Sequence, residues 1–198
     1  MCGREMIKMN VYVLLADGFE EIEALTPVDI LRRAGFDVSM VSIYDRLEVN
    51  GGHNILVKAD IVIDDIDISK ECCVILPGGA VGVTNLKASE KVKNIVKKQN
   101  DKGGLIAAIC AAPTLLSDLG LLNGKIATCY PDLRCELSCE SVPENADVVM
   151  DGNIITSSGA GTSGEFAFAI CSVLGKDNES KKLRGGMCYP SQGVFEKS

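Results

Sequence analysis

One cysteine stands where a chain could expose a nucleophile. Cys110 follows the apolar run at residues 105–109 and precedes Ala111-Ala112-Pro113. A nucleophile on a tight strand-to-helix turn needs small neighbours, because its own backbone is strained and its flanks are crowded. The dipole and free N–H groups of the following helix would favour a thiolate. A buried cysteine in an Ala-rich strand would have the same local sequence, so the motif leaves both interpretations open.

Two other segments could complete a site around this thiol. Gly78 and Gly79 follow the apolar run at residues 73–76, and glycines after a strand let backbone N–H groups point into a site, as an oxyanion hole requires. An ordinary tight turn explains them as well. Glu23 lies in an acidic first helical turn, where the helix dipole stabilises carboxylates. The functional alternative is that its carboxyl points over the sheet toward Cys110.

The elements that must position these residues alternate along the chain. The apolar runs predict strands, and the helical spacing between them predicts helices. Residues 48–64, with Gly51-Gly52, predict a hairpin or an excursion from the main sheet, and Asp151-Gly152 predicts a second hairpin. We expect strands at 10–16, 36–43, 73–76, 105–109, 126–129, 148–150 and 154–156, and helices at 21–34, 89–98, 111–119 and 162–174.

This alternation predicts one α/β domain with a mainly parallel sheet and helices on both faces. Sites in such sheets lie at the carboxyl ends of strands. The last helix is apolar all round, which predicts burial, and Thr162 with Glu165 predicts a capping box at its start. We divide the chain into an N-terminal extension (1–9), the domain (10–184) and a C-terminal tail (185–198), and we expect the polar end from residue 178 to be partly loose.

Composition restricts the class of protein. The chain has 198 residues, a net charge of −7, nine Cys and one His. An acidic chain is a poor nucleic-acid or anionic-membrane binder. The uncharged run 103–117 is shorter than the roughly 20 residues that span a bilayer, and residues 1–9 lack a signal-peptide core. We therefore expect a cytoplasmic protein with reduced thiols, and neither the single His nor the Cys spacing predicts a metal or cofactor.

Five segments together resemble the DJ-1/ThiJ/PfpI superfamily: LLADGFEEIEALTPVDILRRAG, VILPGG, GLIAAICAAPTLL, ATCYP and TSSGAGTS. The resemblance is strongest to its small dimeric branch and implies a flavodoxin-like three-layer sandwich. It implies that Cys110 is the reactive thiol and that Glu23 hydrogen-bonds its sulfur, in protonated form. It also implies that the backbone N–H groups of Gly79 and Ala111 flank the thiol, with Gly78 as an accessory residue.

The chain departs from this family at two places. Many relatives carry a His where this chain has Tyr130, so a Cys–His pair is not available there, which argues against peptidase activity. Ser158 stands where some relatives carry an Arg. His53 falls near a position that, by resemblance, approaches the site from a dimer partner. An exposed hairpin His is the favoured interpretation of His53, and we keep it and Tyr130 as accessory candidates.

The resemblance implies a homodimeric, stress-protective protein that acts through Cys110 on reactive carbonyls. Its chemistry would be of the glyoxalase or deglycase type, on methylglyoxal, glyoxal and their early adducts with amines and thiols, without a cofactor. One alternative is a redox sensor or chaperone in which Cys110 is oxidised. A further alternative is a cysteine peptidase or amidase. The enzyme and the sensor both need an activated thiol and differ in whether the protein turns over methylglyoxal, whereas the missing His argues against the peptidase.

Overall fold

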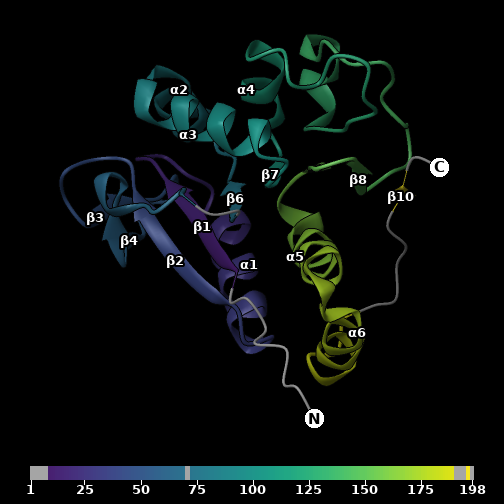
Figure 1. Cartoon of the computed structure of the whole chain (residues 1–198), viewed down its shortest axis with the longest axis horizontal. Coiled ribbons are helices and arrows are strands. Elements are labelled where there is room, and N and C mark those ends of the chain that lie inside the picture. Colours follow the sequence, from purple (N-terminus) through teal and green to yellow (C-terminus); the bar gives the residue numbers. More distant parts are fainter. Residues whose placement is uncertain (1–8, 70–71, 190–194, 197–198) are drawn as a thin grey trace.

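A central sheet organises the computed structural model, which describes residues 9–69, 72–189 and 195–196 (Figure 1). Its eight strands lie in the order β10-β8-β9-β7-β6-β1-β2-β5. The strands from β9 to β5 are mutually parallel, β8 is antiparallel to β9, and β10 is parallel to β8. Their bounds are β1 (Asn10–Leu15), β2 (Asp37–Ser42), β5 (Ile61–Val62), β6 (Cys73–Leu76), β7 (Leu105–Ile109), β8 (Val148–Asp151), β9 (Ile154–Ser157) and β10 (Phe195–Glu196).

Helices cover both faces of this sheet. One face packs against α1 and α5, and the other packs against α2, α3 and α4. A kinked turn at 172–176 leads to α6, which lies outside α5. The α-helices are α1 (Glu21–Arg33), α2 (Ala80–Ala88), α3 (Glu90–Asp101), α4 (Pro113–Asp118), α5 (Ser163–Cys171) and α6 (Asp177–Gly186), and short 3₁₀ turns occupy Ile63–Asp65, Pro131–Glu136 and Ala160–Thr162.

Strand β1 shows why the apolar runs become central strands. Val11, Val13 and Leu15 face α1 and α5, whereas Tyr12 and Leu14 face the opposite helices. All five side chains are buried, so both faces of the strand need apolar residues. The predicted three-layer α/β sandwich is confirmed.

The excursion between β2 and β5 is a separate two-stranded hairpin, as the sequence predicted. Its strands are β3 (Glu48–Asn50) and β4 (Leu56–Lys58), which pair antiparallel. The hairpin tip folds back onto the start of α1: Gly18 donates to the Asn50 carbonyl (2.7 Å), and Gly52 donates to the Phe19 carbonyl (2.8 Å). The tip of the hairpin is thereby fixed against the loop that precedes α1.

Two predicted features are wrong. Residues 126–129 form no strand, since only one bridge, Ile126 to Ser141, joins them to a neighbour and Thr128 donates to the Thr156 hydroxyl instead of a backbone carbonyl. The capping box is also absent. Thr162 binds Gly159 and Ser157 through its hydroxyl, and Glu165 forms an ion pair with Arg184 from α6.

Two helices were not predicted. Residues 80–88 contain a Gly and several β-branched side chains, which disfavour helix, yet α2 forms there after the turn at Gly79. Residues 178–186, expected to be loose, belong to α6, whose Ser180 hydroxyl donates to the Phe168 carbonyl of α5 (3.0 Å). The two predicted domain boundaries, between residues 9 and 10 and between residues 184 and 185, stay predictions.

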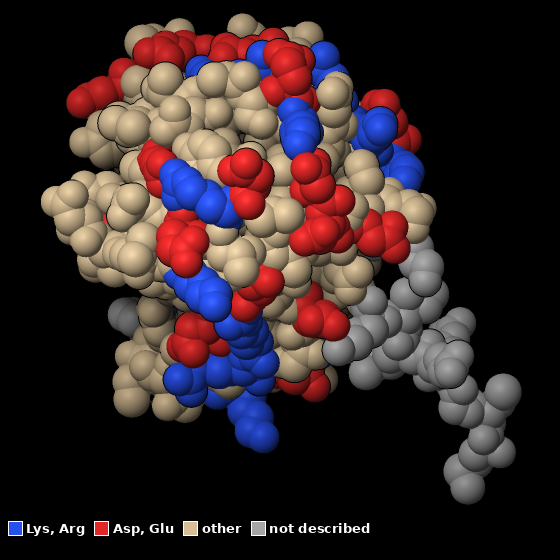
Figure 2. All heavy atoms as spheres, turned by 90° about the vertical axis from the view of Figure 1, so that its left-hand side faces the viewer, with Lys and Arg blue, Asp and Glu red and all other residues tan. Residues whose placement is uncertain are grey.

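The surface that carries the hairpin and α3 is mixed in charge. Figure 2 shows Lys and Arg interspersed with Asp and Glu over much of the face in view, with Lys and Arg side chains adjoining one another toward its lower end. Lys91 pairs with Asp64 (2.6 Å), and Lys93 pairs with Glu90 (2.8 Å). The lysines of α3 thus form a solvated helix face. Among the described residues, every helix is too short or too polar to cross a membrane.

Candidate active site

Cys110 directly follows the last residue of β7 and has a backbone conformation that non-glycine residues seldom adopt. Its φ is +63°, in the left-handed region, which costs an L-residue roughly 1–2 kcal/mol. Two backbone hydrogen bonds hold it there: Cys110 donates to the Ser157 carbonyl (2.9 Å), and Tyr130 donates to the Cys110 carbonyl (2.8 Å). Strain of this kind persists where the surroundings fix it, which is common at functional sites.

Three neighbouring strands bring the partners of this thiol together. β1, β6 and β7 are adjacent in the sheet, and their carboxyl ends lead to Glu23, Gly78 and Cys110. Gly78 donates its N–H to Glu23 Oε2 (2.8 Å), and the Glu23 carboxyl shares a hydrogen bond with the Cys110 thiol. The carboxyl predicted to point over the sheet therefore does so.

Backbone N–H groups complete the surroundings of the sulfur. Gly79 and Ala111 both direct N–H groups at the Cys110 sulfur. Gly79 has φ +93°, and a Cβ there would lie 2.8 Å from the Glu20 nitrogen. A Cβ on Gly78 would lie 2.7 Å from the Cys110 Cβ and would also meet the Glu23 carboxyl. Both glycines are required for this close packing, which an ordinary turn would not need.

The thiol and the carboxyl form one coupled acid pair. Burial raises the pKa of Glu23 to about 7, although hydrogen bonds from Cys110 and Gly78 oppose that rise. Burial raises the pKa of Cys110 to about 12, the charge of Glu23 and its hydrogen bond add to this, and the N–H groups of Ala111 and Gly79 oppose it. The two groups therefore titrate as a coupled pair, and a proton can pass between them along the hydrogen bond that they share.

Helix α4 begins shortly after the thiol. It starts at Pro113 and has six residues, so Cys110 precedes its first turn. The N–H of Ala111, just before this helix, opposes the rise in the thiol pKa that burial and the Glu23 charge cause. The predicted effect of the helix dipole on the thiol stays a prediction.

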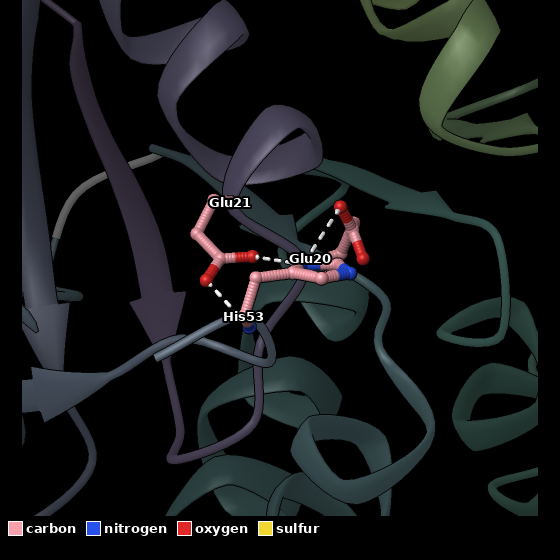
Figure 3. Close-up of side chains that lie close together, drawn as sticks. All are labelled: Glu20, Glu21 and His53. Carbon is pink, nitrogen blue, oxygen red and sulfur yellow. Dashed lines mark hydrogen bonds and ion pairs between the residues drawn. The ribbon is translucent and has the colours of Figure 1, made fainter. Parts of the chain in front are cut away.

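The predicted accessory residues divide into two groups. Tyr130 lies beside Cys110 through its backbone bond, and its exposed ring lies near Gly159. His53, the one histidine of the chain, lies elsewhere, on the loop between β3 and β4 (Figure 3). Its Nδ1 is 2.8 Å from Glu21 Oε2 and 3.7 Å from Glu20 Oε1. Its action on a partner's site stays a prediction.

The association of Glu21 with His53 was not predicted. The residues lie 32 positions apart, and the sequence shows no motif that joins them. Burial alone would raise the pKa of Glu21, but hydrogen bonds from the His53 ring and from its backbone N–H outweigh burial and lower that pKa. The hydrogen bond to Glu21 in turn raises the pKa of His53. The one feature of the sequence that could have indicated this contact is Gly51, since a Cβ at that position would collide with the Glu21 carboxyl.

The other thiols of the described chain lack such partners. All eight described cysteines are free. Burial raises the pKa of Cys72 and Cys171 to about 11 and that of Cys129 to about 12. Cys135 and Cys188 are exposed. Among these eight cysteines, the left-handed elbow conformation combined with a carboxyl partner occurs at Cys110.

A flavodoxin-like sandwich with a strained cysteine at the end of a central strand defines the class of α/β proteins with a cysteine nucleophile elbow. The model of the DJ-1/PfpI family matches residues 9–173, and the chain belongs to this family.

Known relatives agree with this assignment. The chain is 38% identical over 178 residues to Drosophila melanogaster protein dj-1beta, covering 89% of this chain and 95% of that protein. It is 40% identical to Arabidopsis thaliana protein DJ-1 homolog B over 85% of this chain, but it spans only 39% of that longer relative. A Pyrococcus abyssi deglycase is 31% identical over 150 residues, 75% of this chain and 89% of the deglycase.

Solved structures give the same fold. The structure of Toxoplasma gondii DJ-1, described as oxidized, superimposes with a TM-score of 0.88 at 33% identity. It covers 92% of this chain and 100% of its own.

Proposed function

We propose that this protein is a stress-protective, cysteine-dependent enzyme that acts on reactive carbonyls in the manner of a glyoxalase or deglycase. Its substrates would be methylglyoxal, glyoxal and their early adducts with amines and thiols. The observation that carries the proposal is the Glu23 carboxyl on the Cys110 thiol, with its pKa raised to about 7. A carboxyl that titrates near neutral pH can both accept and donate a proton during turnover. The deglycase of P. abyssi supports the same substrate class.

The site can perform the expected steps with its own residues. Glu23 takes the proton of Cys110, and the sulfur attacks the aldehyde carbon of methylglyoxal, which moves the carbonyl electron pair to oxygen. The N–H groups of Gly79 and Ala111 stabilise that oxyanion until Glu23 protonates it, which gives a hemithioacetal. Glu23 then removes the proton on the former aldehyde carbon, and the electron pair moves to the ketone oxygen, which takes up the proton of the hemithioacetal hydroxyl. Protonated Glu23 returns its proton to the neighbouring carbon as the thioester carbonyl forms, which gives a lactate thioester. Water hydrolyses this thioester to lactate and frees the thiol.

Lactate formation tests the proposal. Purified protein supplied with methylglyoxal should release many equivalents of lactate per chain, and Cys110→Ser should abolish this. Cys188→Ser is the matched control, because Cys188 is exposed and also has positive φ, yet it lies near the end of α6. Lactate release by Cys110→Ser at the wild-type rate would contradict the proposal.

A redox sensor or chaperone is the second candidate function. Cys110 is half-buried, and its Glu23 partner could hydrogen-bond a sulfinate formed by peroxide. The T. gondii relative described as oxidized favours this alternative. Selective oxidation of Cys110 by peroxide, with negligible lactate formation, would support the sensor over the enzyme.

Peptide or amide hydrolysis has less support. The one histidine of the chain binds Glu21, so Cys110 has no histidine base within its own chain. Cleavage of a fluorogenic peptide that is lost in Cys110→Ser would revive this alternative.

We also propose that the protein is a cytoplasmic homodimer. Ile22 at the start of α1, and Ile55 and Leu56 on the hairpin, are each more than half exposed. The hairpin tip binds the start of α1, so these apolar side chains come from two segments that the structure joins. Apolar side chains gathered at the surface of one region are typical of association sites.

A further inference from the structure

Three potential metal ligands converge outside the Cys110 site. Glu20 and Glu21 stand at the start of α1, and His53 reaches them from the hairpin loop (Figure 3). One donor atom from each residue lies within 4.8 Å of the other two. The closest approaches are those of His53 Nδ1 to Glu21 Oε2 (2.8 Å) and to Glu20 Oε1 (3.7 Å).

The cluster is held in place by the fold. The Glu21 side chain is only 6% exposed, and its Oε1 accepts the backbone N–H of His53 (2.8 Å). Gly51 lies so close to this carboxylate that any Cβ would displace it. A parallel bridge joins Phe19 to Gly51 and fixes the loop against the start of the helix. Glu21 Oε2 therefore faces the imidazole in a preformed position, whereas the His53 side chain is 69% exposed and open to solvent.

We propose that Glu20, Glu21 and His53 form a binding site for one divalent transition metal of the zinc type. Zinc binds imidazole nitrogen and carboxylate oxygen at about 2.0–2.2 Å, so its ligand atoms lie roughly 3–4 Å apart. The separations of 2.8 and 3.7 Å need only small side-chain movements to reach this geometry. In the single chain, the exposed side of His53 leaves a fourth coordination position open.

The donor set also selects among metals. One imidazole favours zinc, cobalt or nickel over magnesium and calcium, which prefer oxygen ligands throughout. Two carboxylates balance the charge of a divalent ion. The site differs from the thiol site in its residues, and the proposal does not depend on the carbonyl chemistry of Cys110. One backbone hydrogen bond, from Glu20 to the Gly78 carbonyl (3.0 Å), joins the two sites.

Metal titration of the full chain tests the proposal. Zinc binding is followed by calorimetry and cobalt binding by absorption, and we expect one equivalent of each. Removing a residue that only supports a metal ligand weakens metal binding by roughly 10- to 100-fold. His53→Ala and Glu20→Gln each remove a ligand itself, so we expect them to weaken binding by more than this. Glu90→Gln, an exposed carboxylate on α3, and Cys110→Ser are the matched controls and should bind as the wild type does.

The variants separate this site from metal binding by thiols. His53 is exposed, and the Glu20 side chain makes no helix-capping hydrogen bond, so neither substitution should unfold the chain. The cobalt complex of the wild type should lack a thiolate-to-cobalt charge-transfer band, because the three ligands contain no sulfur. The proposal is overturned if His53→Ala and Glu20→Gln bind like the wild type, if that band dominates, or if no stoichiometric binding occurs.

Discussion

Replacing Glu23 by Gln tests how the thiol is activated. In the wild type, the pair loses its first proton near pH 7 and its second near pH 12. Between these values it carries one negative charge, and a fixed small fraction has that charge on sulfur. Glutamine keeps the shape of the side chain and an acceptor for the Gly78 N–H, but it cannot take the proton. The variant thiol must therefore ionise directly to solvent.

The two proteins should differ in how their rates depend on pH. Above pH 7, the wild-type thiolate fraction is set within the pair, so the alkylation rate should change only a few-fold up to about pH 9. In Glu23→Gln the charge that raises the Cys110 pKa is gone, so that pKa should fall below 12. Until the pH reaches this lower pKa, the variant rate should rise about tenfold per pH unit.

Iodoacetamide alkylation, followed by mass spectrometry of the Cys110 peptide, measures both profiles and excludes the exposed Cys135 and Cys188. Glu90→Gln is the control, because its side chain lies on the surface of α3 and should leave the profile unchanged. Two superimposable curves for wild type and Glu23→Gln would refute the shared-proton mechanism.

Glu23→Gln should also change stability. The pKa of Glu23 in the folded protein, about 7, exceeds its ordinary 4.5, so ionisation of Glu23 opposes folding. As the pH rises from 4.5 through 7, the free energy of unfolding of the wild type, measured with urea, should fall by up to about 3 kcal/mol relative to that of the variant. Equal pH dependence of the two proteins would contradict the burial of this acid. Cys110→Gly should be more stable than Cys110→Ala by about 1–2 kcal/mol in the same assay, because glycine relieves the positive φ; equal stability would mean that the elbow is unstrained. Gly78→Ala should lower both lactate formation and stability, the latter by roughly 1–3 kcal/mol, because its Cβ meets Cys110 and Glu23; wild-type turnover would show that the packing can relax. Ile22→Asp should convert a dimer to a monomer in light scattering, whereas the exposed control Val173→Asp should not, and an unchanged dimer would place the interface elsewhere.

The central elements could be predicted because their physical requirements are local. A strand covered on both faces must be apolar throughout, and each of the strands β1, β6 and β7 is such a run. Helix α2 could not be predicted, since its Gly and β-branched residues disfavour helix and tertiary packing of Val83 and Leu86 offsets this. Residues 126–129 carry a strand-like sequence, but Thr128 binds a side chain where a strand would bind backbone.

The positions of the residues of the Cys110 site could be predicted from the sequence, but their electrostatics could not. Cys110, Glu23 and Gly78 each follow a recognisable strand, and parallel strands place their carboxyl ends together. The raised pKa of the thiol was not predictable, because it depends on burial and on the charge of a residue far along the chain. The contact of His53 with Glu21 was likewise hidden, since it depends on where a hairpin folds back.

The order of the strands also determines when this site can exist during folding. The hydrogen bond from Gly78 to Glu23 spans 55 residues of chain and needs β1 beside β6. Such long-range pairing loses loop-closure entropy before its stabilising contacts form, so it forms slowly. A chain that has folded β6 and β7 alone presents Cys110 without its carboxyl, as a thiol that titrates independently. Pulsed alkylation during refolding would therefore time the moment at which the N-terminal strand joins the sheet.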